Sequence, residues 1–325
     1  ARLRVRICFP CSSSHIVMIS RAILLVIAAS SVADAASSRS GAAGFVPAPL
    51  SPLSTSVVSA ARASGGRMGL RGGAASGLRM ADIKICKDVD SVGKALCEVV
   101  EESAKKAMEE KGHFAFTIPG GSILKMLSGL KGDSSIDWSK ATMAWVNHRA
   151  VPLDDETSTD FKAQSLFLKS WEEQGLNVIK LTGSTDAVKE EEAYAKALKS
   201  LPSDVCPPNA DGVPMFDLSL IGMGTDGHIG SLYPDTPATA EREKLVVSVV
   251  KPASSSISLS LPVMLASKRV VVASAGKSDK YPLGKAEGVK RALEGDETTS
   301  SFPASALRGK ALWILDEDSA ALLGK

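Results

Sequence analysis

From residue 90 onward, segments of helical periodicity alternate with short runs of apolar and β-branched residues. This alternation predicts a parallel sheet whose strands are connected by helices. We expect helices over residues 90–111, 123–130, 157–174, 186–201, 262–266, 281–293 and 319–323. We expect strands over residues 114–118, 141–146, 178–181, 216–221, 245–250, 269–274 and 311–315. The pattern indicates one α/β domain over residues 81–325, a Rossmann-like, mostly parallel sheet flanked by helices.

The N-terminal part of the chain has a different composition. Residues 1–81 contain nine Arg, no Lys and a single acid, Asp34, which leaves 29 basic and 35 acidic residues in the remainder. The basic character therefore belongs to this segment and does not indicate nucleic-acid binding. The apolar stretch 22–33 is too short to span a bilayer and has the form of a secretory signal, and a transit-like composition follows it. We expect residues 1–80 to be a targeting leader without a fold, and the mature protein to have no membrane segment.

Residues 41–47, in which Phe45 follows small residues, resemble the junction of the bipartite leaders that direct proteins into complex plastids. This resemblance implies a plastid location. A secreted protein with a linker, or a cytosolic protein with a disordered tail, are the alternatives.

The strand 216–221 runs directly into a glycine-rich loop that carries Asp226 and His228. Ligands bind at strand ends of open α/β sheets, and a histidine beside glycines leaves room for a substrate. The ordinary pKa of an imidazole, near 6.5, suits a general base at neutral pH, so we predict this role for His228. Asp226 either orients the ring or caps the loop backbone. The neighbouring residues expected to contact substrate are Gly224, Thr225 and Gly227.

The same loop also matches a dinucleotide fingerprint, with Gly222, Gly224 and Gly227 at the required spacing. That fingerprint requires a helix to begin at its third glycine. Pro234 and Pro237 interrupt the residues that follow, so no long helix can begin there. The sequence therefore disfavours a dinucleotide site.

Two further expected strand ends carry groups suited to an anion. Gly120, Gly121 and Ser122 lie between a strand and a helix, where backbone N–H groups can approach a phosphate. An ordinary turn capped by Ser122 is the alternative. Arg149 follows the strand 141–146 and offers a planar fork for a phosphate or a carbonyl oxygen. Its alternative is a surface ion pair with a nearby aspartate.

Two lysines, Lys251 and Lys277, follow later strand signals. Solvated lysines are common, so only convergence with the other loops makes these two candidate phosphate ligands.

Together these segments resemble the 6-phosphogluconolactonase family, in a sugar-phosphate isomerase-like superfamily that includes glucosamine-6-phosphate deaminase. The family has Gly-x-Gly-x-Asp-Gly-His and then Ser-Leu-Phe-Pro, where this chain has residues 222–228 and 231–234. The resemblance covers the chain from residue 91 to its end. It implies hydrolysis of 6-phospho-D-glucono-1,5-lactone in the oxidative pentose phosphate pathway, with His228, Asp226 and Arg149 as catalytic residues. Lactone opening requires no metal or cofactor, so we expect none, and we expect a monomer whose partner is this small molecule.

The chain departs from the family pattern in two places. The family usually has Asp-Glu-Arg where this chain has Asn147, His148 and Arg149, and it has an Arg where this chain has Ser256. We expect His148 to be structural or exposed. The lost acids leave a non-catalytic sugar-phosphate-binding protein as one alternative. A deaminase-like enzyme is the other, although residues 231–234 lack the glutamate that deaminases carry there.

Overall fold

The computed structural model describes residues 82–130, 134–252, 254–277 and 284–324. The predicted leader, residues 1–80, and the predicted helix start at Tyr281 lie outside the described residues. None of the helices in the described part of the chain is both long and apolar enough to cross a membrane.

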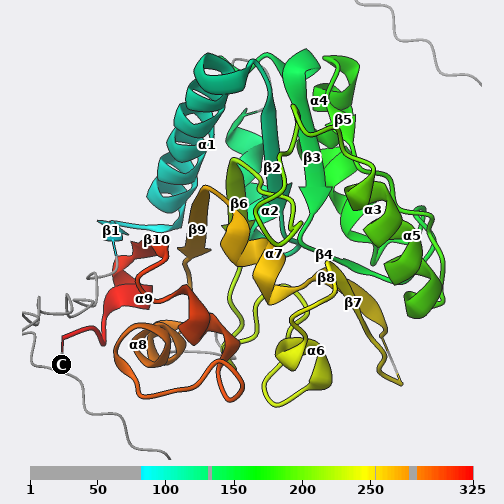
Figure 1. Cartoon of the computed structure of the whole chain (residues 1–325). Helices are drawn as coiled ribbons and strands as arrows, with labels where there is room; N and C mark the ends of the chain where they lie inside the picture. The colour runs from blue at the N-terminus through cyan, green and yellow to red at the C-terminus, as the bar shows by residue number, and fades with distance from the viewer. Residues whose placement is uncertain (1–81, 131–133, 253, 278–283, 325) are drawn as a thin grey trace, which may run out of the picture. The chain divides into compact units, whose positions relative to one another are not determined.

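The central sheet consists of parallel strands, as expected (Figure 1). In spatial order they are β1 (Asp82–Cys86), β10 (Ala311–Asp316), β9 (Arg269–Ser274), β6 (Leu218–Ile221), β2 (Phe114–Ile118), β3 (Ala141–Trp145) and β5 (Asn177–Val178). The chain builds the sheet outward from β2 through β3 to β5, and then returns to β6 on the other side of β2. Ligands bind where the strand order reverses in this way, so the crevice lies between the ends of β2 and β6.

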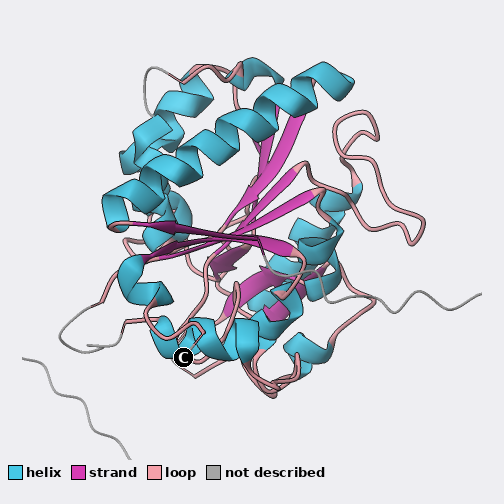
Figure 2. Cartoon of the chain, turned by 90° about the vertical axis from the view of Figure 1, so that its left-hand side faces the viewer, coloured by secondary structure: helices cyan, strands magenta, loops and turns pink. Residues whose placement is uncertain are grey.

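Helices pack on both sides of this sheet (Figure 2). They are α1 (Val89–Lys111), α2 (Ser122–Leu127), α3 (Thr159–Ala163), α4 (Lys169–Glu173), α5 (Ala187–Lys199), α6 (Pro237–Ala240), α7 (Leu261–Ala266), α8 (Ala286–Glu294) and α9 (Glu317–Ala320). The predicted helix 157–174 is divided into α3 and α4 by a π-helical segment, Gln164–Leu168. The fold is the α/β class that the alternating pattern predicts.

A small antiparallel sheet lies beside the main one and was not predicted as such. It is formed by β4 (Asn147–Arg149), β8 (Ser256–Leu259) and β7 (Val246–Val249), and it places Arg149 opposite Ser256. Of its strands, only β7 was predicted. β4 is too short and polar to give a strand signal, whereas the Ser–apolar alternation of β8 was a usable one.

The long helix α1 shows how local sequence sets the element boundaries. Asp88 caps it, because its carboxylate accepts the backbone N–H of Ser91 at 2.8 Å. Gly112 ends it in a left-handed conformation, at φ 74°. One apolar face of the helix is buried against the sheet (Val92, Leu96, Val99 and Val100).

Stacked aromatic rings form the core under β2 and β3. The rings of Trp138 and Trp171 stack at 4.1 Å between centroids, and Phe116 and Phe167 pack against Trp171. Each of these four side chains is at most 2% exposed. This packing fixes the strand from which the glycine loop of the crevice emerges.

Candidate active site

A cavity of about 670 Å³ lies at the carboxyl ends of the central strands. It collects loops that are far apart in the sequence. The loop after β2 contributes Gly120, Gly121 and Ser122; β4 contributes Asn147 and Arg149; α3 contributes Thr159 and Lys162; the loop after β6 contributes Gly224, His228 and Tyr233; later segments contribute Lys251, Ser256 and Lys285. The expected convergence of separate strand ends is therefore present.

His228 and Asp226 form a direct pair in the loop after β6. The Nδ1 atom of His228 lies 2.6 Å from Oδ1 of Asp226, and the same oxygen accepts the backbone N–H of His228 at 3.2 Å. Asp226 thus fills both roles proposed for it, since it orients the ring and also caps the loop backbone. A carboxylate can only accept, so Nδ1 carries a proton, and in the neutral ring Nε2 has the lone pair.

The surroundings of Asp226 favour the ionised form of its carboxyl group. Partial burial tends to raise the pKa of the carboxyl, but the neighbouring His228 and the hydrogen bonds that it donates outweigh burial. The pKa of Asp226 is therefore below its ordinary value, and the group stays ionised at neutral pH.

Gly224 gives the pair its space. A Cβ at this position would lie 2.2 Å from Cε1 and Nδ1 of His228 and 2.6 Å from Oδ1 of Asp226. Any side chain at residue 224 would displace the imidazole. A glycine is needed here because the His228 and Asp226 side chains pack directly against its Cα, and not because the backbone is left-handed.

An aromatic ring and a lysine lie beside the imidazole. The rings of His228 and Tyr233 are 4.7 Å apart between centroids. The ammonium of Lys251 lies 3.0 Å from the centroid of the Tyr233 ring. A cation over a ring face is attracted to it, so Tyr233 holds Lys251 at the cavity wall.

Asn147 connects three of the loops. Its Oδ1 accepts the backbone N–H of Gly120 at 3.2 Å, and its Nδ2 donates to Oγ of Ser231 at 3.4 Å. The N–H of Gly120 is thus already bonded, and the glycine loop offers a ligand chiefly Gly121 and Ser122. Ser122 does not cap α2, because it is the first helical residue and Gly121 occupies the cap position at φ 87°.

The ionic side chains that line the cavity, among the described residues, are all basic. Arg149, Lys162, Lys251 and Lys285 line it, and no Asp or Glu does so among the described residues. Such a surface attracts an anionic ligand and excludes a cationic one. Among the residues that the structure describes, no three His, Cys, Asp or Glu side chains are grouped to hold a metal ion.

The structure does not bring Lys277 to this cavity. Its ammonium pairs with Asp318 at 2.8 Å, on an exposed surface. Lys285 lines the cavity instead and donates to the carbonyl of Met223. Burial lowers the pKa of this lysine, and no described carboxylate pairs with it. An anion bound in the cavity would therefore serve as its counter-ion.

Thr225 and Gly227 do not line the cavity, and Gly227 has a structural role. It has φ 82°, and a Cβ there would lie 2.5 Å from the buried ring of Phe302. Its carbonyl accepts the N–H of Ala304 at 2.9 Å. The loop that carries His228 thus rests on the segment around Phe302.

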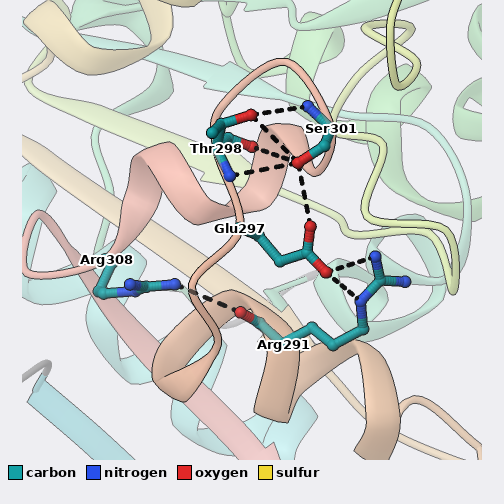
Figure 3. A network of polar contacts seen from close by, with 5 residues as sticks. All are labelled: Arg291, Glu297, Thr298, Ser301 and Arg308. Carbon is teal, nitrogen blue, oxygen red and sulfur yellow. Dashed lines mark hydrogen bonds and ion pairs between the residues drawn. The ribbon is translucent and has the colours of Figure 1, made fainter.

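A polar network holds that segment (Figure 3). The carboxylate of Glu297 accepts Nε and Nη2 of Arg291 at 2.8 and 2.6 Å, and it accepts Oγ of Ser301 at 3.0 Å. Arg291 also lies over the ring of Phe302, at 4.3 Å. Helix α8 is thereby connected through Phe302 to the loop that carries His228.

Sequence reasoning missed Lys162, Lys285 and Asn147 as lining residues. Lys162 belongs to a helix and follows no strand, and Lys285 precedes α8, so neither satisfies the strand-end criterion. Asn147 had a signal, since it directly follows the predicted strand 141–146.

Comparison with known proteins places the chain among sugar-phosphate enzymes. A family model described as glucosamine-6-phosphate isomerases/6-phosphogluconolactonase matches residues 87–314. A 6-phosphogluconolactonase of Homo sapiens is 31% identical over 255 residues, covering 74% of this chain and 93% of that protein. A chloroplastic 6-phosphogluconolactonase of Arabidopsis thaliana is 30% identical, covering 70% and 71%. The structure of the Trypanosoma brucei 6-phosphogluconolactonase shares the fold, with a TM-score of 0.63 at 23% identity over 75% of this chain and 99% of that one.

Proposed function

We propose, because the chain belongs to the family of glucosamine-6-phosphate isomerases and 6-phosphogluconolactonases, that it hydrolyses 6-phospho-D-glucono-1,5-lactone to 6-phosphogluconate. One observation carries this assignment. The Asp226–His228 pair, with a lone pair on Nε2, lines a cavity whose described ionic side chains are cations. The pair supplies a base for water, and the cations hold a phosphorylated lactone and its carboxylate product.

The same lining disfavours deamination of an amino sugar. A deaminase of this fold requires a carboxylate in the site, and the described lining has none. The substrate of a deaminase also carries a positive ammonium group, which the cations of the cavity would repel.

In the proposed reaction, His228 acts as the general base. Nε2 takes a proton from a water molecule as the water oxygen attacks C1 of the lactone. The negative charge of Asp226 stabilises the imidazolium that forms. The tetrahedral oxyanion then collapses, the bond from C1 to the ring oxygen breaks, and that oxygen takes the proton from His228 to become the 5-hydroxyl group. The carboxylic acid formed in this way releases the second proton of the attacking water to solvent, and the product is a carboxylate.

Arg149 and the lysines position the substrate in this proposal. The 6-phosphate binds to Gly121, Ser122 and Lys285, while Arg149 faces the lactone carbonyl and stabilises the developing oxyanion. Anchoring the phosphate fixes the reacting carbon relative to the water, which lowers the entropy cost of attack.

The decisive experiment compares His228→Ala with wild type in residues 80–325. We expect turnover to fall about 10²- to 10⁴-fold, the usual contribution of a general base, after the spontaneous reaction is subtracted. Binding of 6-phosphogluconate, measured by calorimetry, should persist. His113→Ala serves as the matched control, because His113 bonds Thr142 and does not line the cavity. Wild-type turnover in His228→Ala would exclude the mechanism.

A pair of lysine variants tests the phosphate site. We expect Lys285→Ala to raise KM about 10- to 100-fold, because it removes a charged hydrogen-bond donor from the anion. Lys277→Ala should leave KM unchanged, since that lysine pairs with Asp318 outside the cavity. Equal effects of the two substitutions would contradict the assignment.

We infer a plastid location from the leader-like residues 1–80. Chloroplastic relatives in Arabidopsis thaliana and rice support this inference. A fluorescent protein fused behind residues 1–80 should accumulate in the plastid of an algal host. Accumulation in the secretory pathway or the cytosol would support one of the two alternatives instead.

A further inference from the structure

His148 is fully enclosed although it lies between two residues that line the cavity. Asn147 and Arg149 point into the cavity from β4, and side chains alternate along a strand, so His148 points the other way. Its side chain is 1% exposed and packs near Trp145, with 6.0 Å between the ring centroids.

The partners of His148 determine its protonation state. Nδ1 lies 2.6 Å from the carbonyl oxygen of Arg149, which can only accept, so Nδ1 carries a proton. Nε2 lies 3.2 Å from the backbone nitrogen of Asp160, which can only donate, so Nε2 has a lone pair. The ring is therefore neutral. Burial lowers its pKa more than the Arg149 carbonyl and the charge of Glu190 raise it, which agrees with this state.

The acceptor side of the ring connects to the start of α3. Oγ of Ser158 lies 3.1 Å from Nε2. The same hydroxyl oxygen accepts the N–H of Phe161 at 3.2 Å as the N-cap of α3, so its hydrogen is available to the ring. Nε2 thus accepts from both the cap residue and the first turn of this helix.

These contacts connect two segments that each bring a cation to the cavity. β4 carries Arg149, and α3 carries Lys162. Both cations also act on Asp155: hydrogen bonds from Thr157, followed by the charges of Arg149 and Lys162, hold the pKa of that carboxyl below its ordinary value. Arg149 and Lys162 line the same cavity, so one anionic ligand can meet both of them.

We propose that His148 is a positioning residue for the anionic substrate, and that its neutral ring fixes β4 to α3 so that Arg149 and Lys162 bind one ligand together. This inference rests on the proposed function. It assigns to Lys162 a substrate contact, and to His148 a role in affinity and not in the chemical step.

Two substitutions separate the two sides of the ring. His148→Asn keeps a donor near the Nδ1 position but loses the acceptor for α3. His148→Gln places an acceptor near the Nε2 position and loses the donor to Arg149, whose carbonyl still accepts the N–H of Val151. We expect His148→Asn to raise KM for the lactone and Kd for 6-phosphogluconate about tenfold, with kcat nearly unchanged. His148→Gln should raise both by less than about threefold.

A double-mutant cycle tests whether His148 acts through Lys162. In a Lys162→Ala background, His148→Asn should change KM less than about twofold, because the helix then has no cation to misplace. The proposal would be overturned if the effects of His148→Asn and Lys162→Ala on KM were additive. It would also be overturned if His148→Asn and His148→Gln changed the melting temperature and left KM unchanged. Ser158→Ala, which removes the hydroxyl between the ring and α3, replaces His148→Asn in the cycle if the latter does not fold.

Two controls separate this inference from the proposed function. His113→Gln alters another histidine that makes a side-chain hydrogen bond, outside the cavity, and should leave KM unchanged. Absence of lactonase activity in wild type would refute the proposed function itself. An active wild type with KM unchanged in His148→Asn would refute only the inference.

Discussion

At the scale of single residues, the geometry of the proposed catalytic pair depends on a missing side chain. Gly224→Ala would place a methyl group 2.2 Å from the His228 ring, so the imidazole must move. Because a displacement of 1 Å at a reacting group can cost about 100-fold, we expect kcat to fall by about that factor with KM nearly unchanged. Steady-state kinetics and a melting curve test this, and the fold should persist because Gly224 does not adopt a positive φ.

Gly222 provides the matched control for that substitution. It also lines the cavity, but a Cβ there would come no closer than 3.8 Å to Ile123, an ordinary contact. Gly222→Ala should therefore retain most of the activity. Equal losses in the two variants would show that the loop, and not the contact with His228, is sensitive.

These residues also show what the sequence could reveal. Asp226 and His228 were predicted as a pair because both follow a strand in a glycine-rich loop. The individual roles of the glycines were not predictable, since Gly224 serves a side-chain contact and Gly227 a left-handed turn against Phe302, and both depend on three-dimensional packing. Lys285 was missed for a similar reason, because its burial in the cavity depends on where the start of α8 lies.

At the scale of elements, the segment between α8 and η4 (Pro303–Leu307) supports the loop that carries His228. Glu297 connects Arg291 of α8 to Ser301, and Phe302 lies under Gly227. In Glu297→Gln the charge that holds Arg291 is lost, and the support under His228 loosens. A displacement of about 1 Å at a reacting group can lower the rate about 100-fold, and a loosened support moves the imidazole by less than that. We therefore expect kcat to fall about three- to tenfold with KM unchanged.

The same kinetic assay tests this element directly. Glu287→Gln changes an exposed carboxylate in the first turn of α8 and should leave kcat unchanged. If Glu297→Gln raised KM and not kcat, the segment would support the cations and not His228.

Elements with strong periodicity were predictable, whereas the short ones around the site were not. The strands Phe114–Ile118 and Arg269–Ser274 have the predicted bounds, because apolar runs in a central parallel sheet are buried on both faces. β4 has only three residues, and it is a strand because β8 pairs with it. Its strand geometry aims Arg149 into the cavity and His148 into the core, which the residue types alone do not indicate.

At the scale of the whole molecule, the buried neutral His148 should make stability depend on pH. Its folded pKa is lowered by burial, while an unfolded histidine titrates near 6.5. Above that pH both states are neutral, and the full stability is present. As pH falls below about 6.5, the unfolded chain takes up a proton that the folded chain does not, so the free energy of unfolding decreases by up to about 1.4 kcal/mol per pH unit.

Urea unfolding of wild type and His148→Gln between pH 8 and pH 5.5 isolates this contribution. Carboxyl groups of the unfolded chain titrate mostly below this window, near pH 4, and His113, whose pKa burial also lowers, is present in both chains. The stability difference between wild type and variant should therefore stay constant from pH 8 to about 6.5 and shrink below that pH. A difference that stays constant would mean that the ring titrates as it does in the unfolded chain, and a difference that grows as pH falls would mean that the folded ring is protonated. Neither outcome fits the dry contact in which Nε2 of His148 accepts the N–H of Asp160 and joins β4 to α3.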